Sequence, residues 1–203
     1  MNLPVSRPLE FPSLSLSERD RRWENLRGLM RRHDVAALLV AGLSGMWKFD
    51  GYVANEHAEG YVVLPLQGEP VYLTWTPSYI ARHRESVARG AGEWVRDWRI
   101  GTDGAGVARA LQGMGLAQAR IGVVGVSGGT PPIEPDGWIP YGTWRQVLDA
   151  LPGAAFVHLT RQFIETILVK SEEELRLLRH AAAAGERACA AMLRAARVGA
   201  LEC

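Results

Sequence analysis

The sequence has few cysteines, no long apolar run and no leader of a recognisable type. Its two cysteines, Cys189 and Cys203, lie close together near the C-terminus, which excludes the disulfide framework of a small secreted domain. No segment approaches the roughly 18 uninterrupted apolar residues of a membrane-spanning helix, and the N-terminus lacks the basic start and apolar run of a signal peptide. We therefore expect a cytoplasmic protein that is neither exported nor inserted in a membrane.

An excess of charge of one sign is also missing. The 203 residues include 23 basic and 22 acidic side chains, a formal net charge of +1, and both signs are spread along the chain. A surface that binds nucleic acid needs clustered basic residues, so no nucleic-acid partner is expected. Hydrophobic residues at 47% and charged residues at 22% are typical of a folded globular protein.

Metal-ligand motifs are absent as well. The two cysteines form no CxxC pair. The histidines stand in neither HExxH nor HxH spacing; they are His33, His57, His83, His158 and His180. The sequence therefore indicates no metal and no other cofactor in this chain.

Three further stretches fall short of catalytic patterns. GVVGVSGG at 122–129 matches neither phosphate-loop spacing, so we interpret it as a turn-rich loop. Ser44 in GLSGM misses the GxSxG nucleophile elbow because residue 46 is methionine. Glu56 and His57 could act as general acid and base if both faced a cleft, but we favour exposed loop positions for them.

Strands alternating with helices are what the chain does contain. Ser17, followed by Asp20, predicts a helix that ends near His33, and the apolar run VAALLVA at 35–41 predicts a strand buried on both faces. The β-rich runs within 60–75 flank Gln67 to Pro70 and predict a hairpin. Beyond them we expect helices at 78–88, 104–114 and 143–151, and strands at 94–98, 120–126 and 155–159. The predicted fold is α/β, with a mixed sheet flanked by helices.

The C-terminal segment predicts a separate long helix. Ser171 and Glu174 form a capping box, and Gly199 is the expected C-cap, which gives about 27 residues and a length of roughly 40 Å. Apolar and small residues recur along one side at intervals of three and four; they are Leu175, Leu178, Ala182, Gly185, Cys189 and Met192. This interface seam would pack either on the domain's own sheet or on a partner elsewhere, and we favour the partner.

The loop at 42–61 concentrates aromatic residues between two strands. Trp47, Phe49, Tyr52 and His57 supply these rings, and amphipathic rings on loops are common where ligands or partners bind. The alternative is that the rings cover the edge of the sheet.

The order of these parts resembles the N-terminal domain of the creatinase and Xaa-Pro peptidase family. The resemblance runs from VAALLVAG through RIGVVG and LPGAAFVHLT, and its most specific part is VKSEEELRLLRHAAAAGERA, which is similar to the family's Lys-Ser-x-x-Glu junction. RVGALE at 197–202 resembles the Gly-x-x-Glu step that follows the first helix of the pita-bread catalytic domain. Ile167 departs from the family, which usually has arginine at that position.

The resemblance implies a three-layer creatinase N-terminal-like domain at 17–165. It is preceded by an arm at 1–16 and followed by a linker and the first helix of an otherwise absent catalytic domain at 166–203. In the family a binuclear metal site, for Mn, Co or Zn, is formed by two Asp, one His and two Glu of the catalytic domain. The chain is thus expected to be truncated and inactive alone, to assist oligomerisation and substrate access, and to pair with the catalytic domain or as a homodimer. The resemblance places the substrate-access role in the loop that holds Trp47, Asp50, Tyr52 and His57.

Two other hypotheses stay open at this point. One is a self-contained binding or assembly module that dimerises through the helix at 171–197. The other is an independent α/β enzyme that acts through Glu56 and His57.

Overall fold

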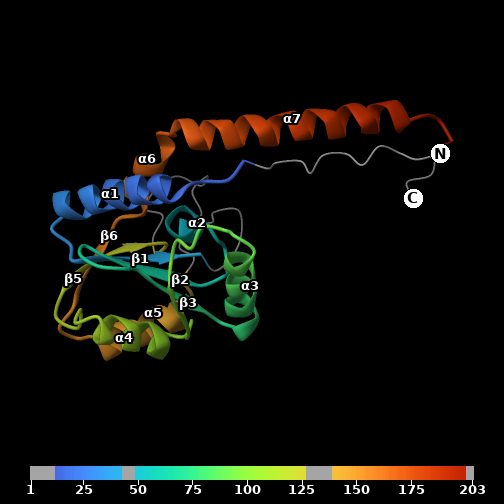
Figure 1. Ribbon diagram of the computed structural model, residues 1–203. Helices are drawn as coiled ribbons and strands as arrows, with labels where there is room; N and C mark the ends of the chain where they lie inside the picture. Colours follow the sequence, from blue (N-terminus) through green and yellow to red (C-terminus); the bar gives the residue numbers. More distant parts are fainter. Residues whose placement is uncertain (1–11, 43–48, 127–138, 200–203) are drawn as a thin grey trace. The chain divides into compact units, whose positions relative to one another are not determined.

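The computed structural model describes residues 12–42, 49–126 and 139–199 (Figure 1). The chain divides into two compact units, residues 15–169 and a second unit of residues 1–14 with 170–203. The described strands are β1 (Ala37–Ala41), β2 (Tyr61–Pro65), β3 (Val71–Thr74), β4 (Asp97–Ile100), β5 (Arg120–Val124) and β6 (Ala155–His158). The described helices are α1 (Leu16–Arg32), α2 (Phe49–Ala54), α3 (Pro77–Ala88), α4 (Gly104–Gly113), α5 (Tyr141–Ala150), α6 (Thr160–Leu168) and α7 (Glu172–Ala195).

The six strands form one mixed sheet in the order β4-β3-β2-β1-β5-β6. Strand β2 is antiparallel to both of its neighbours, and the other pairings, of β1 with β5, β5 with β6 and β3 with β4, are parallel. The predicted hairpin is present as β2 and β3, with Val63 opposite Val71. The carboxyl ends of β1 and β3 therefore lie at the same edge as the start of β2. The mixed α/β sheet expected from the sequence is confirmed.

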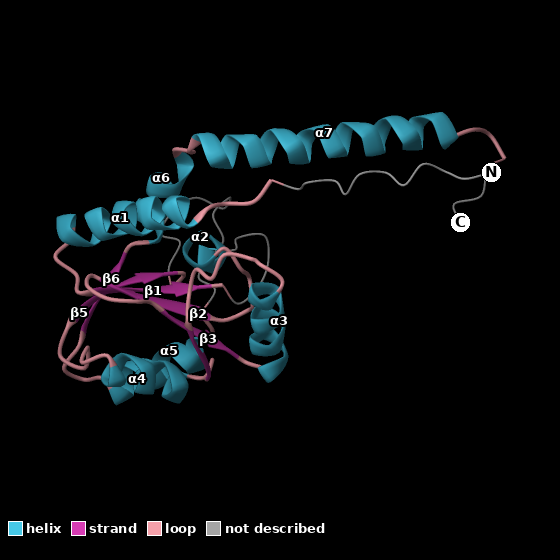
Figure 2. Cartoon of the chain, in the orientation of Figure 1, coloured by secondary structure: helices cyan, strands magenta, loops and turns pink. Residues whose placement is uncertain are grey.

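Helices cover both faces of the sheet (Figures 1 and 2). On one face, Leu38 and Val40 of β1 pack in a core with the apolar sides of α1, α2 and α6. On the other, Leu39 of β1 packs in a second core with α4 and α5. All five residues of β1 are buried, which explains why this strand is an uninterrupted apolar run instead of an alternating one.

Helix α1 begins two residues earlier than the sequence suggested. The side chain of Ser15, not that of Ser17, accepts the cap hydrogen bond, from the backbone N–H of Glu18. The buried Glu18 carboxylate also pairs with Arg22, at 2.9 Å between Oε1 and Nε. Trp23 donates a hydrogen bond from Nε1 to the carbonyl of Val53, at 2.8 Å, and so ties α1 to α2.

Several predicted bounds were wrong, and two helices were missed. The strand expected at 94–98 is β4 at Asp97–Ile100, and Trp94 and Val95 are instead buried side chains of the preceding segment. Helices α2 and α6 were not predicted. Gly51 in the middle of the short α2 and the four β-branched residues in α6 weaken the local helix signal, so packing against α1 stabilises both.

The second unit contains α7, whose capping box is present as predicted. The Ser171 side chain accepts from the N–H of Glu174 at 3.1 Å, and the Glu174 carboxylate accepts from the N–H of Ser171 at 2.9 Å. The helix ends at Ala195 with Ala196 as its C-cap, so Gly199 is not the cap that the sequence indicated. None of the helices in the described part of the chain is long and apolar enough to cross a membrane.

Candidate functional site

A buried cluster of polar side chains centres on Asp50, in the first turn of α2. Its carboxylate is fully buried, at 0% exposure, and both of its oxygens lie 2.9 Å from Nδ1 of His57. The Tyr72 hydroxyl, from β3, donates a hydrogen bond to Oδ2 of the same carboxylate. We call these three residues the Asp50 cluster.

Two glycines make room for the Asp50 cluster. Gly42 follows β1, and a Cβ at this position would lie 2.0 Å from Cγ of Asp50. Gly60 precedes β2, and a Cβ there would lie 1.8 Å from the carbonyl oxygen of Leu73. The N–H of Gly42 donates to the carbonyl of Gly60 at 2.8 Å, so the two close approaches belong to one junction.

The segment that carries His57 is fixed by hydrogen bonds to neighbouring elements. The N–H of Ala58 donates to the Tyr72 hydroxyl at 2.8 Å, and the carbonyl of Ala58 accepts from Oγ1 of Thr74 at 2.9 Å. Arg82 of α3 donates to the carbonyl of His57 at 3.2 Å. The His57 imidazole is therefore held by its backbone as well as by Asp50, while its side chain retains 20% exposure.

The burial of the Asp50 cluster shifts the pKa of two of its members. Removal from water raises the pKa of the Asp50 carboxyl above its ordinary value of 3.8, and the hydrogen bonds from Tyr72 and His57 counteract this only in part. Burial also raises the pKa of the Tyr72 hydroxyl well above its ordinary value, and the neighbouring Asp50 adds to the shift. Tyr72 thus stays a neutral donor. A carboxylate that orients an imidazole at the surface could support proton exchange with a bound group.

A second carboxylate and imidazole pair is joined to Tyr72 through the ring of Trp98. Glu56 Oε1 is 2.5 Å from Nδ1 of the buried His83 in α3. The Trp98 ring stacks on the Tyr72 ring, with centroids 4.2 Å apart, and on the His83 ring, at 4.5 Å. Glu56 and His57 therefore have different partners and do not form the acid and base pair considered from the sequence.

The predicted contact residues of the loop separate into distinct environments. Asp50 and His57 are brought together, as described above. Tyr52 instead lies buried on the side of α1 and α6, with its ring 6.0 Å from that of Phe163 and with the Arg22 guanidinium 4.5 Å from its centroid. Trp47 lies outside the described residues.

The predicted interface seam lies along α7 and is largely exposed. Leu178 is 52% exposed and Met192 71%, and a Cβ added at Gly185 would meet nothing within 4 Å. Ala182 and Cys189 are exposed too, and Leu175 is half-buried.

Sequence reasoning missed Tyr72, His83 and Trp98. Tyr72 and Trp98 are a cross-strand pair of β3 and β4, and His83 reaches them from α3. No short motif joins the three positions. Their residue types were the one available indication of a polar cluster, because Tyr, Trp and His inside otherwise apolar elements usually have a polar partner when buried.

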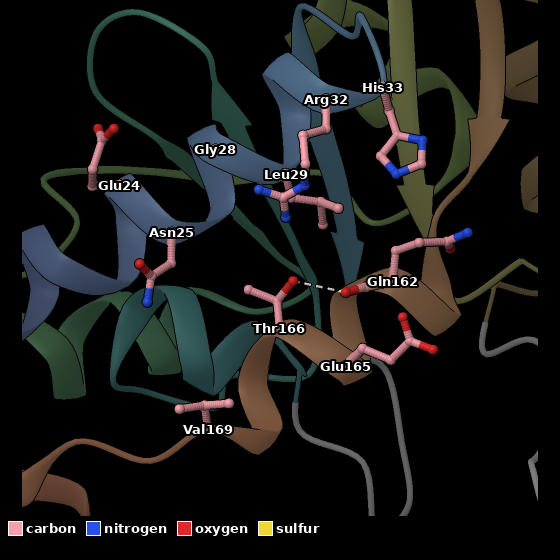
Figure 3. Close-up of a pocket in the computed structure, with 10 residues that line it drawn as sticks. All are labelled: Glu24, Asn25, Gly28, Leu29, Arg32, His33, Gln162, Glu165, Thr166 and Val169. Carbon is pink, nitrogen blue, oxygen red and sulfur yellow. Dashed lines mark hydrogen bonds between the residues drawn. The ribbon is translucent and has the colours of Figure 1, made fainter.

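A hollow of about 600 Å³ lies between α1 and α6, which are side by side (Figure 3). Its walls are mixed in charge and polarity; the lining residues are Glu24, Asn25, Gly28, Leu29, Arg32, His33, Gln162, Glu165, Thr166 and Val169. The hydroxyl of Thr166 donates to the carbonyl of Gln162 at 2.8 Å, within α6. None of these residues was a predicted site residue. Their opposed charges, from Arg32 on α1 and Glu165 on α6, could accept a ligand with both a positive and a negative group.

The described residues offer no group of three or more His, Cys, Asp or Glu side chains that could hold a metal ion. Asp50 and Glu56 each contact a histidine, but each pair comprises only two such side chains.

Comparison with protein-family models and with curated protein sequences gives no match. Solved structures do match. The Xaa-Pro dipeptidase from Bacillus anthracis is 18% identical with a TM-score of 0.59, over 91% of this chain and 45% of that chain. The prolidase from Pyrococcus horikoshii is 13% identical with a TM-score of 0.60, over 90% and 45%. The dipeptidase PepE from Mycobacterium ulcerans is 23% identical with a TM-score of 0.56, over 87% and 44%.

These likenesses establish the fold. The chain spans less than half the length of each of these three proteins, while nearly all of it is matched. The fold expected from the sequence resemblance is confirmed: these residues fold like one part of an Xaa-Pro dipeptidase chain.

Proposed function

We propose that this chain is the N-terminal, non-catalytic domain of an Xaa-Pro peptidase or creatinase-like metallohydrolase, which acts in oligomerisation and substrate access. The observation that carries the proposal is the extent of the structural match. About nine tenths of this chain corresponds to 45% of the Bacillus anthracis Xaa-Pro dipeptidase. The Lys170, Ser171 and Glu174 junction, whose capping box is formed, adds support from the sequence.

The divalent metal, Mn, Co or Zn, belongs in this proposal to the complete enzyme and to residues outside these 203. The proposal places the protein in the cytoplasm, as a homodimer or joined to a catalytic domain. Its two cysteines and nearly balanced charge agree with that location and with partners other than nucleic acid.

The Asp50 cluster is the part that we assign to substrate access. His57 is partly exposed, and it is oriented by a carboxylate that is itself buried. A held side chain recognises a ligand at lower entropic cost than a free one. We assign the same role to the whole segment that holds Trp47, Asp50, Tyr52 and His57, in which the buried Asp50 carboxylate holds the His57 imidazole.

An activity assay of the purified chain tests the assignment. With Mn or Co added, the 203 residues should not hydrolyse an Xaa-Pro dipeptide above the rate of the metal alone. Metal-dependent turnover that tracks the protein through purification would contradict it. The gene beyond codon 203 gives a second test, because the proposal requires an in-frame region with two Asp, one His and two Glu in the family's order.

One observation favours a second candidate, a self-contained assembly module that dimerises through α7. The seam from Leu175 to Met192 is largely exposed and has small residues at its centre, so a second helix could approach closely. Replacement of Ala182 and Gly185 by glutamate should then weaken self-association in sedimentation equilibrium. Matched glutamate substitutions at Ala184 and Ala191, on the opposite side of the helix, should have little effect. Unchanged association in the Ala182 and Gly185 variant would exclude the module.

A further inference from the structure

Strand β4 is an outer strand of the sheet, and the backbone N–H and carbonyl groups on its outer edge belong to particular residues. It pairs with β3 on one side, and no strand of the described residues pairs with its other side. The N–H of Gly101 donates to the carbonyl of Thr74 at 3.0 Å, which continues the parallel β3–β4 ladder past Ile100. Because backbone groups alternate in direction along a strand, the groups of Asp97 and Arg99 point to β3, and those of Trp98 and Ile100 point outward.

Along this edge a negative and a positive side chain stand two residues apart, an order that would match the same edge of a second, antiparallel copy. Asp97 and Arg99 lie on the same face, where the guanidinium binds the carboxylate through Nε at 2.9 Å and through Nη2 at 2.5 Å. Both are well exposed, at 42% and 44% of their side-chain area. Ile100 next to them is 50% exposed, a high value for an isoleucine in a strand.

We propose that the outer edge of β4 pairs antiparallel with the same edge of a second copy of this chain. With Trp98 opposite Trp98 of the second copy, the outward N–H and carbonyl groups of both copies form a hydrogen-bonded pair. Asp97 then stands opposite Arg99, and Arg99 opposite Asp97, on one face of the extended sheet. The other face brings the two Trp98 rings together beside their stacks on Tyr72.

The charges select this register over its neighbour. A shift of one residue in each copy would put Arg99 opposite Arg99, and like charges directly opposite destabilise an antiparallel pair. The other outer strand, β6, has no such pair of opposite charges. Ala155, Phe156 and Val157 are uncharged, and His158 is the single titratable residue of that strand. A second copy of this chain is thus the occupant that the β4 edge fits.

The pairing gives an interface to the oligomerisation that forms part of the proposed function, but it does not depend on the peptidase assignment. It is also separate from the α7 seam, because β4 lies in the unit of residues 15–169. It involves only four or five residues from each copy, so a weak, reversible dimer is expected. Association should be visible at about 100 µM protein in sedimentation equilibrium. A wild-type chain that stays monomeric there would overturn the proposal.

The first variant removes an outward hydrogen-bond donor. In Ile100→Pro the lost N–H faces away from β3, so the internal ladder keeps its bonds, while two intermolecular bonds disappear from each dimer. The dissociation constant should rise about thirtyfold. Ile100→Val, which keeps the N–H, is the matched control and should stay near the wild-type value. Equal association of the proline and valine variants would contradict edge pairing.

The second variant set tests the charges and does not depend on whether proline is tolerated. Arg99→Glu should weaken association about tenfold, because two attractive cross-strand pairs become repulsive. The exchange Asp97→Arg with Arg99→Asp restores both pairs and should return association to within about threefold of wild type. Failure of the exchange to recover association would exclude the proposed register, provided that circular dichroism shows both variants folded.

Hydrogen exchange gives a readout that a dimer through α7 would not produce. The Arg99 amide, bonded to β3, should be protected at every protein concentration. The Trp98 and Ile100 amides should gain protection only as the concentration rises. If all three amides behave alike, or if the glutamates at Ala182 and Gly185 remove the effect, the second copy does not bind at β4.

Discussion

The fully buried carboxylate of Asp50 holds the partly exposed imidazole of His57, with Nδ1 2.9 Å from each carboxylate oxygen. Seven positions separate the two residues, and the turn after α2 brings them face to face. Tyr72 completes the arrangement from β3 and also accepts a hydrogen bond from the backbone of Ala58. The Asp50 cluster thus joins α2, the following loop and the sheet. Substitutions in it should therefore change the free energy of unfolding, and the direction of each change can be predicted.

The Tyr72 hydroxyl should contribute measurably to stability, whereas the Tyr61 hydroxyl should not. Tyr72→Phe keeps the stack on Trp98, but it removes one hydrogen bond from the buried Asp50 carboxylate, which retains His57, and leaves the Ala58 N–H without its partner, at a cost of about 2 kcal/mol. The Tyr61 hydroxyl is buried with no hydrogen-bond partner among the described residues, so Tyr61→Phe should be neutral or stabilising. Urea unfolding of both variants provides the measurement, and equal losses would contradict the assignment of the network.

The Asp50 carboxyl should make stability depend on pH. Burial raises its pKa in the folded state above the ordinary 3.8, so the folded chain binds this proton more tightly than the unfolded chain does. The stabilising contribution is therefore complete below pH 3.8 and is lost as the pH rises through the raised folded pKa.

Substitution of Asp50 by asparagine removes this dependence. The comparison is best made in a His57→Gln background, where the imidazole does not titrate. Two proteins are compared, the single variant His57→Gln and the double variant that also carries Asp50→Asn. The free energy of unfolding of the single variant, less that of the double variant, should fall as the pH rises from about 4, by at most about 1.4 kcal/mol per pH unit. The measurement is urea unfolding in steps of pH. A difference that grows with pH would show that the folded state favours the ionised carboxylate.

Local signals in the sequence predicted much of the fold. The Ser171 and Glu174 capping box, the apolar run of β1 and the turn between β2 and β3 were each identified because neighbouring residues determine them. Helices α2 and α6 escaped prediction, since both are short and depend on packing against α1. The cap of α1 was misplaced by two residues because Ser15 and Ser17 are equally suitable by type.

The candidate site was predicted only in part. Asp50 and His57 were singled out from their loop, but their contact was not foreseen. Tyr72 was not considered, because 22 positions separate it from Asp50 and its role depends on the register of β3 beside β2. Glu56 and His57 are adjacent in sequence, yet Glu56 contacts His83 of α3 and His57 contacts Asp50 of α2. Contacts of this range come from the sheet topology.

Gly42 should tolerate no side chain. A Cβ there would lie 2.0 Å from Cγ of the buried Asp50, which is confined by His57 and Tyr72, so Gly42→Ala should destabilise the fold by about 3 kcal/mol or more. Gly142, in the first turn of α5, is the matched control, because a Cβ there meets nothing within 4 Å. Gly142→Ala should be neutral or stabilise by up to about 1 kcal/mol. Thermal unfolding compares the two, and similar melting temperatures would rule out the tight junction at Gly42.

Helix α7 should be the least protected helix of the described chain. Most of its side chains are exposed, with Met192 at 71% and Leu193 at 77%, so few buried contacts oppose its opening. We expect its amides to exchange far faster than those of β1, whose five residues are all buried. Ser171→Ala removes half of the capping box and should speed exchange in the first turns of α7 about fivefold, for a cap worth about 1 kcal/mol. The β1 amides, in the other unit, serve as the internal control. Exchange in α7 as slow as in β1 would mean that a partner covers the helix, and its loss on dilution would identify that partner as a second copy of the chain.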